Sequence, residues 1–220
     1  MPINYKLSTI NSLTNTSFIQ SYLLIYLLME KTLVLIKPDA VQRGLVGEII
    51  SRFEKAGLKL LATKMVHPDQ DLASKHYPTH RREWVEGMGH KSIDSYKEVG
   101  QDPKDTFGSD DPHEVGLQLQ KWLIDFLTSG PVIALVLEAP EAVKKVRDIA
   151  GHTIPVKAEK GTIRGDYSDD SALKANAEGR SIQNLIHASG DQEEADFEIN
   201  LWFKPEELFN YQAAHQHLTK

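Results

Sequence analysis

The sequence predicts an α+β fold built on one antiparallel sheet, with helices on one face and further helices added at the surface. Four short apolar segments are bounded by turn signals, and helical patterns separate them in the order β-α-β-(helices)-β-α-β. This order is the βαββαβ, or ferredoxin-like, arrangement. No internal repeat or linker divides the chain, so we expect one domain.

The predicted strands are short apolar runs that end at turn residues. The first reads TLVLI, and Lys37-Pro38-Asp39 closes it as a turn. The third, PVIALVLE, is strongly apolar, and the last is the short run NLIHA. The four predicted strands span residues 32–36, 58–66, 131–138 and 184–188.

Helical spacing of apolar residues marks the segments between the strands. In residues 44–57 apolar side chains recur every three or four positions, and Gly57 stands where a helix C-cap belongs. Asp191, with Glu194 three positions later, forms an N-terminal capping signature for the last helix. The other predicted helices span residues 71–77, 113–130 and 140–151.

Two segments interrupt the regular pattern. Residues 78–112 are rich in Gly, Asp and Lys and show no sustained period, which predicts a surface insertion with one or two short helices. Residues 168–182 form a second insertion of mixed helical character. The domain is therefore expected to span residues 29–220 with these two insertions.

Residues 1–28 differ in composition from the rest of the chain. A polar start leads into the apolar run FIQSYLLIYLLM, which is shorter than the ~20 residues that a membrane span requires. Only Lys6 precedes this run, and no small-residue cleavage site follows it. A membrane anchor is one interpretation. We favour the other, a non-essential extension of the domain in which Met29 is the functional initiator.

Composition limits the classes of partner. The formal net charge of −6 argues against nucleic-acid binding, which depends on excess Lys and Arg, but it leaves room for a small anionic ligand. The absence of cysteine excludes disulfides and thiolate metal sites. We therefore expect a cytoplasmic protein without nucleic-acid or membrane partners.

Cationic and polar side chains stand at the ends of the predicted elements. The sequence contains no P-loop, G-x-G-x-x-G, H-E-x-x-H or G-x-S-x-G motif. Element ends can converge in a ferredoxin-like fold, and Lys and Arg gathered there suit a polyphosphate. The candidate residues are Lys37 after the first strand, Arg147 in the last turn of a helix, Thr153 and Arg164 in the loop beyond it, and Asn184 and His187 around the last strand.

His187 is followed by small residues. An imidazole is mostly uncharged at neutral pH, and in-line attack on phosphorus requires one fixed tautomer with free space before the attacking nitrogen. Ala188 and Gly190 supply that space, and either Glu194 or Glu198 could hold the opposite nitrogen. The alternative is that His187 merely ends a strand and hydrogen-bonds to its backbone.

Several segments together resemble nucleoside diphosphate kinase. The resemblance runs from residue 29 to residue 211, apart from the insertions. It is specific because it combines a strand followed by K-P-D, the sequence T-I-R-G-D, and N-x-x-H followed by small residues. The segments are MEKTLVLIKPDAVQRGLVGEII, SGPVIALVLE, GTIRGDY, NLIHASGD and EINLWFKPEELFNY.

The resemblance implies a reaction and a role for each candidate residue. His187 is implied to take the γ-phosphoryl group of a nucleoside triphosphate as a phosphohistidine and to pass it to a nucleoside diphosphate. Magnesium is implied to bridge the phosphates and to need few protein ligands. The remaining roles are phosphate binding by Lys37, Arg147, Arg164 and Thr153, ribose binding by Asn184, lining of the site by Tyr77, orientation of the ring by Glu198, and support of that carboxylate by Ser189.

Three departures from the family pattern affect these expectations. Spacing points to Trp84 as the residue that stacks on the base, although a core tryptophan is an equal alternative. Ala188 replaces the usual glycine and still leaves room for phosphate. The second insertion falls in a loop that the family uses in assembly, so the implied homo-oligomer, a hexamer or tetramer, is the least secure expectation. A nucleotide-binding regulator without turnover is the competing function.

Overall fold

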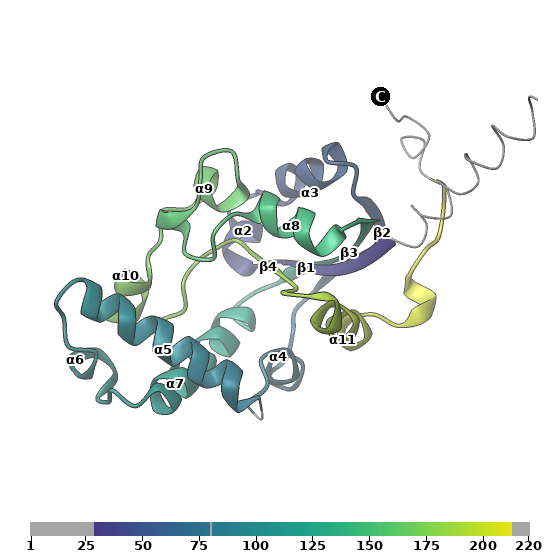
Figure 1. The fold of residues 1–220 in the computed structure, drawn as a ribbon. Coiled ribbons are helices and arrows are strands. Elements are labelled where there is room, and N and C mark those ends of the chain that lie inside the picture. Colours follow the sequence, from purple (N-terminus) through teal and green to yellow (C-terminus); the bar gives the residue numbers. More distant parts are fainter. Residues whose placement is uncertain (1–28, 80, 213–220) are drawn as a thin grey trace, which may run out of the picture.

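The computed structural model describes residues 29–79 and 81–212, and Figure 1 shows their arrangement. A four-stranded antiparallel sheet lies at the centre of the fold, with strand order β2-β3-β1-β4. This is the order of a ferredoxin-like sheet, so the predicted fold class is confirmed. The predictions for residues 1–28 lie outside the described residues. The strands are β1 (Met29–Ile36), β2 (Lys59–Val66), β3 (Val132–Pro140) and β4 (Ile186–Ala188).

Alternating residues of β1 serve two separate hydrophobic cores. Val34 and Ile36 face α3 (Val46–Lys55) and α8 (Ala142–Ala150), the two helices of the βαββαβ unit. Side chains along a strand point alternately to opposite faces, so Leu33 and Leu35 belong to the other core. All four of these β1 side chains are fully buried.

The second core is covered by helices that the minimal unit does not contain. They are α4 (Gln70–His76), α7 (Pro112–Leu127) and α11 (Gln192–Trp202). Helices on one face were expected, and this holds for α3 and α8. The added helices were predicted at the surface, but they bury the opposite face instead, so the sheet is covered on both sides (Figure 1).

The first insertion contains one long helix, α5 (Arg82–Glu98), followed by α6 (Lys104–Phe107). Short helices were predicted here, and for α5 that prediction was wrong. Its buried positions do follow helical spacing, but two of them are glycine and serine, which hid the apolar period. Gly89 and Gly116 let α5 and α7 approach closely, because a Cβ on Gly89 would lie 1.8 Å from the Pro112 carbonyl oxygen.

The second insertion packs against the first. The buried Asn176 side chain donates a 2.9 Å hydrogen bond to Ser92 of α5. None of the helices in the described part of the chain is long and apolar enough to cross a membrane. The remaining short elements are α2 (Pro38–Gln42), η1 (Pro155–Lys157), α9 (Ile163–Tyr167), α10 (Ala172–Ala177) and η2 (Pro205–Glu207).

Candidate active site

His187 lies in the middle of β4, beside the central strand of the sheet. It pairs with Leu35 of β1, so a buried strand fixes its backbone. Leu185, the residue before β4, is fully buried and adopts φ 70°, a left-handed conformation that is unusual for a residue with a side chain. The amide of Ile186 donates to the carbonyl of Asn184 at 2.8 Å, which closes a three-residue turn immediately before the histidine.

The turn at Leu185 is held on both sides by the segment that follows β1. The Leu185 amide donates to Oδ2 of Asp39 at 3.1 Å, and the Leu185 carbonyl accepts from the Lys37 amide at 2.8 Å. A strained backbone conformation persists only where its surroundings hold it. The Lys-Pro-Asp sequence therefore braces the chain that carries His187, a role that sequence reasoning did not assign to Asp39.

Arg164 also binds the backbone of this turn. Its Nε donates to the Asn184 carbonyl at 3.1 Å and its Nη2 to the Ile186 carbonyl at 2.8 Å. Its Nη1 donates to the Gly151 carbonyl at 2.7 Å. Three of the five guanidinium N–H groups are thus used, and two remain for a ligand. Arg164 was placed in a loop by sequence; it lies in the short helix α9.

Glu198 of α11 holds the ring of His187. Its Oε1 lies 2.7 Å from Nε2 of His187, and its Oε2 accepts from the Ser189 hydroxyl at 2.6 Å. Of the two carboxylates considered from sequence, Glu198 is therefore the partner. Glu194 instead accepts a hydrogen bond from the Gly190 amide. The N-cap predicted at Asp191 is present, since its side chain accepts from the Glu194 amide.

The His187 ring is uncharged at neutral pH. Burial, followed by the charge of Lys37, lowers its pKa to about 3. Because a carboxylate only accepts hydrogen bonds, the ring proton lies on Nε2, and Nδ1 carries the free lone pair. No group in the described residues hydrogen-bonds to Nδ1. Burial also raises the pKa of Glu198, whereas His76 and the Ser189 hydroxyl lower it.

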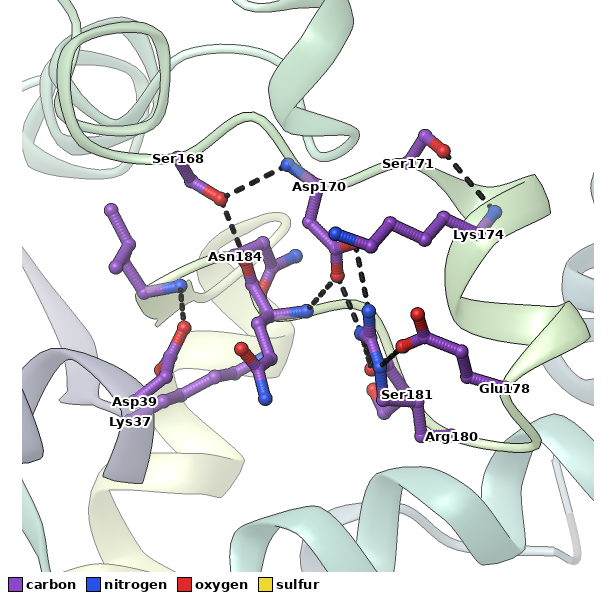
Figure 2. Close-up of polar contacts among 12 residues, drawn as sticks. Lys37, Asp39, Ser168, Asp170, Ser171, Lys174, Glu178, Arg180, Ser181 and Asn184 are labelled. Carbon is purple, nitrogen blue, oxygen red and sulfur yellow. Dashed lines mark hydrogen bonds and ion pairs between the residues drawn. The ribbon is translucent and has the colours of Figure 1, made fainter.

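Lys37, Asn184 and Thr153 are linked beside the turn. Lys37 Nζ donates to Oδ1 of Asn184 at 2.9 Å, and Nδ2 of Asn184 donates to the Thr153 carbonyl at 3.0 Å. Lys37 and Asn184 are buried, whereas Thr153 is exposed. Burial, followed by the charge of Arg164, lowers the pKa of Lys37 to about 8. Figure 2 shows Lys37 and Asn184 next to Asp39.

A cavity of about 170 Å³ opens at the histidine. Tyr77, Trp84, Arg147, His187 and Glu198 line it, which brings together five of the nine predicted site residues. The other four do not line it; Lys37, Arg164 and Asn184 are buried, and Thr153 is exposed. The charges of Lys37, Arg164 and Arg147 all act to lower the pKa of His187.

Two comparisons with known proteins, one with family models and one with single relatives, match the same family. A family model described as nucleoside diphosphate kinase matches residues 30–86 and 113–208, more than half of the chain. The chain is 50% identical over 180 residues to the nucleoside diphosphate kinase of Pyrobaculum aerophilum, which covers 82% of this chain and 98% of that protein.

This chain belongs to the nucleoside diphosphate kinase family.

Solved structures of nucleoside diphosphate kinases share the fold. A crystal structure of an NDP kinase from Pyrobaculum aerophilum is similar with a TM-score of 0.80 at 48% identity, covering 83% of this chain and 100% of that chain. A transition state mimic of the Borrelia burgdorferi nucleoside-diphosphate kinase with bound vanadate and ADP has a TM-score of 0.68 at 37% identity, covering 86% and 96%. The chain is therefore a phosphotransferase of this family. The gap in the family match falls within the insertion that contains α5.

His76 is a site residue that sequence reasoning missed. Its side chain is fully buried, and its ring lies edge-on to His187 with centroids 4.4 Å apart. Nδ1 accepts from the indole N–H of Trp202 at 3.3 Å, and burial lowers the pKa of His76 to about 3. The only sequence signal was its position beside Tyr77. This kinase therefore places a second neutral imidazole behind the first.

The side chains of the site do not suit a resident magnesium ion. His76, His187 and Glu198 form the one group of potential metal ligands among the described residues. Magnesium prefers oxygen ligands, and two of these three groups are imidazoles, each with one nitrogen already in a hydrogen bond. A magnesium ion used by this nucleoside diphosphate kinase would therefore be held mainly by nucleotide phosphates.

Proposed function

We propose that this chain transfers the γ-phosphoryl group of a nucleoside triphosphate to a nucleoside diphosphate through a phosphohistidine at His187. The observation that supports this most strongly is the ring geometry. Glu198 engages Nε2 at 2.7 Å and leaves the Nδ1 lone pair free, in a ring whose low pKa keeps it neutral. A neutral imidazole fixed in one tautomer beside a cavity is the form that attacks phosphorus.

The reaction balances in two half-reactions. The Nδ1 lone pair of His187 forms a bond to the γ-phosphorus as the bond between that phosphorus and the bridging oxygen breaks, and the nucleoside diphosphate departs. The imidazolium that forms keeps its proton on Nε2, and Glu198 stabilises the positive charge of the ring. A β-phosphate oxygen of a second nucleoside diphosphate then forms a bond to the phosphorus as the bond between phosphorus and Nδ1 breaks, and the electron pair returns to Nδ1 to restore the neutral ring.

Three cations neutralise the phosphates. Arg147 is exposed and lines the cavity with His187, and it makes no ion pair with any described residue. Arg164 keeps two free N–H groups, and Lys37 lies next to it. Phosphoryl transfer depends mainly on alignment and charge neutralisation, so this arrangement fits the reaction. Thr153 completes the phosphate-binding set in this proposal.

The nucleoside end of the ligand is assigned to Asn184 and Trp84. Asn184 would bind the ribose, as the family resemblance implies, and its side-chain amide lies next to Lys37. Tyr77 and Trp84 stack with an interplanar angle of 9° and both line the cavity. We assign base stacking to Trp84, which would tolerate different bases because every base offers a flat face.

Three further parts of the proposal concern cofactor and context. Magnesium would be held by the phosphates of the nucleotide, and it would supply positive charge during transfer. The second insertion leaves the oligomeric state open between the tetramer and hexamer of the family pattern, and a homo-oligomer is proposed. A cytoplasmic location remains a prediction from the absence of cysteine.

The deciding experiment measures transfer of a labelled γ-phosphate from ATP to the protein. The full chain is incubated with γ-labelled ATP and magnesium, and we expect a phosphoprotein that is acid-labile and base-stable. Addition of unlabelled GDP should discharge the label into GTP. His187→Ala should abolish labelling, whereas His152→Ala, at an exposed histidine, should label normally. ADP binding without any labelled protein would instead favour a nucleotide-binding regulator.

A further inference from the structure

The second insertion holds the residue that precedes Asn184 by both of its backbone polar groups. The Gln183 amide donates to Oδ2 of Asp170 at 2.8 Å, and the Gln183 carbonyl accepts from the Ser168 hydroxyl at 2.8 Å. Figure 2 shows Ser168 and Asp170 on the same side of the segment that leads to Asn184. The Ser168 bond holds the planar peptide group that joins Gln183 to Asn184, and the Asp170 bond holds the peptide group before it. Together they restrain the backbone that leads into Asn184.

Asp170 is itself held rigidly. Nη1 and Nη2 of Arg180 donate to its two carboxylate oxygens at 2.6 and 3.0 Å, a bidentate pair (Figure 2). Asp170 is only 6% exposed. Burial acts to raise its pKa, but the hydrogen bonds from Arg180 and Gln183 outweigh burial and lower it, so the carboxylate is charged at neutral pH.

The helix α10, which follows Asp170 in the second insertion, is anchored to the rest of the protein. Asn176 in α10 donates to Ser92 of α5, and both side chains are buried. Ser171 caps α10 by accepting from the Lys174 amide. The loop that carries Asp170 is thus tied to the first insertion, and its position is fixed independently of any ligand.

Asn184 transmits this restraint to the proposed nucleotide site. Its side chain accepts from Lys37 Nζ and donates to the Thr153 carbonyl, and its own carbonyl accepts from Arg164. The next residue, Leu185, is held in a left-handed conformation, which requires restraint from the chain on both sides. Asp39, Lys37 and Arg164 provide it at and beyond Asn184, and Asp170 provides it before Asn184.

We infer that Asp170 is a positioning residue for nucleotide binding, which acts by holding the Gln183 amide and thereby the backbone that carries the side-chain amide of Asn184. This inference rests on the proposed function, in which Asn184 binds the ribose. Asp170 itself does not line the cavity at His187. The second insertion would therefore contribute to substrate binding from outside the pocket.

The test compares Asp170→Ala and the milder Asp170→Asn with a matched control, Glu207→Gln. Glu207 accepts two bonds from Lys64 and one from a backbone amide, the same pattern as Asp170, but at the far edge strand β2. We expect Asp170→Ala to lower kcat/KM and to weaken ADP binding about tenfold, because small misplacements of a positioning group reduce transfer strongly. Asp170→Asn keeps one acceptor and should lose about threefold. Glu207→Gln should stay within about twofold of the parent.

A double-mutant cycle with Asn184→Ala distinguishes an effect of Asp170 on the position of Asn184 from a general loss of rigidity in the protein. If Asp170 acts through Asn184, adding Asp170→Ala to Asn184→Ala should change kcat/KM and ADP affinity less than about twofold further. The pH dependence of His187 phosphorylation should not change in Asp170→Asn, because the His187–Glu198 pair is untouched. Full additivity in the cycle, unchanged ADP affinity in Asp170→Asn, or an equal loss in Glu207→Gln would overturn the inference. Absence of labelling in the parent would refute the proposed function instead, while ADP affinities would still decide the role of Asp170.

Discussion

Nε2 of His187 and Oε1 of Glu198 lie 2.7 Å apart, and this contact determines which ring nitrogen can react. Ser189 donates to the other oxygen of the same carboxylate, so Glu198 is fixed at both ends. The carboxylate is 2% exposed and stays in place without help from solvent. The orientation of the nucleophile thus depends on two hydrogen bonds between β4, the turn after it, and α11.

We expect Glu198→Gln to slow phosphorylation of His187 by roughly 100-fold, the lower end of what a positioned proton partner contributes. Glutamine can accept a hydrogen bond but cannot stabilise the charge of the imidazolium. Ser189→Ala should cost about tenfold, because the carboxylate loses one of its restraints. Single-turnover labelling with ATP measures both rates. Asp196→Asn, an exposed position on the same helix, is the control, and equal rates in all three variants would contradict this role.

Substitution of Arg147 and of Arg164 by alanine should have different effects on stability, although both should lower activity. Arg147 is exposed and unpaired among the described residues, so Arg147→Ala should leave the unfolding free energy unchanged while lowering kcat/KM. Arg164 donates to three backbone carbonyls, so Arg164→Ala should also destabilise the fold by about 3 kcal/mol. Urea unfolding and steady-state kinetics on the same preparations measure both effects. A stability loss in Arg147→Ala equal to that in Arg164→Ala would show that the exposed arginine is structural.

The order of strands and helices along the chain was predicted from the sequence, because it depends on local patterns. Apolar runs, turn residues and the spacing N-x-x-H are all readable along the chain. The residues alone left the choice between Glu194 and Glu198 open, because it depends on the direction in which α11 leaves β4, and only the family resemblance assigned Glu198. The structure resolves it in favour of Glu198.

Features that depend on distant contacts were not predicted. Nothing local indicates that Leu185 has positive φ, since an apolar residue normally avoids that conformation, and Asp39 lies 146 positions away. The length of α5 was missed for a different reason. Its buried face contains Gly89 and Ser92, which a search for apolar residues does not count.

The alkaline limit of activity should follow Lys37. Burial, followed by the charge of Arg164, lowers the pKa of Lys37 to about 8, whereas Asp39 acts in the opposite direction. The cation is lost as pH rises through this value, so kcat/KM should fall above about pH 8. Asp39→Asn removes the charge that raises the pKa, so the fall should begin at lower pH. Asn can still accept from the Leu185 amide, which limits structural damage.

The matched control for Asp39→Asn is Asp148→Asn, an exposed carboxylate on α8 that pairs with Lys144. It should leave the pH profile unchanged. The measurement is kcat/KM against pH, which reports ionisations of the free enzyme. An alkaline limit that stays in place or moves to higher pH in Asp39→Asn would show that Lys37 does not set it.

Stability should fall on the acid side because two imidazoles, the buried His76 and the partly buried His187, resist protonation. Burial lowers the pKa of His76 and of His187 to about 3, below the 6.5 expected in the unfolded chain. Between these values the unfolded state binds more protons, so stability is complete above pH 6.5 and is lost as pH falls toward 3. Each group contributes a slope of up to ~1.4 kcal/mol per pH unit. Urea unfolding at several pH values should show a smaller slope in His187→Gln, and an unchanged slope would contradict the assignment.

Trp84 tests the nucleobase end of the site. Its ring lies parallel to Tyr77, with centroids 6.1 Å apart, and it lines the cavity while also packing against the second core. If it stacks on the base, Trp84→Ala should weaken ADP, GDP and CDP binding by similar factors of about ten, since stacking contributes ~1–3 kcal/mol for each base. Trp84→Phe should retain most of the affinity.

The control is Trp122→Ala, at a ring that packs against Phe107 in the insertion, which should lower stability without changing affinity. If Trp84→Ala behaves like Trp122→Ala in calorimetric titrations, Trp84 is a core residue and another group contacts the base.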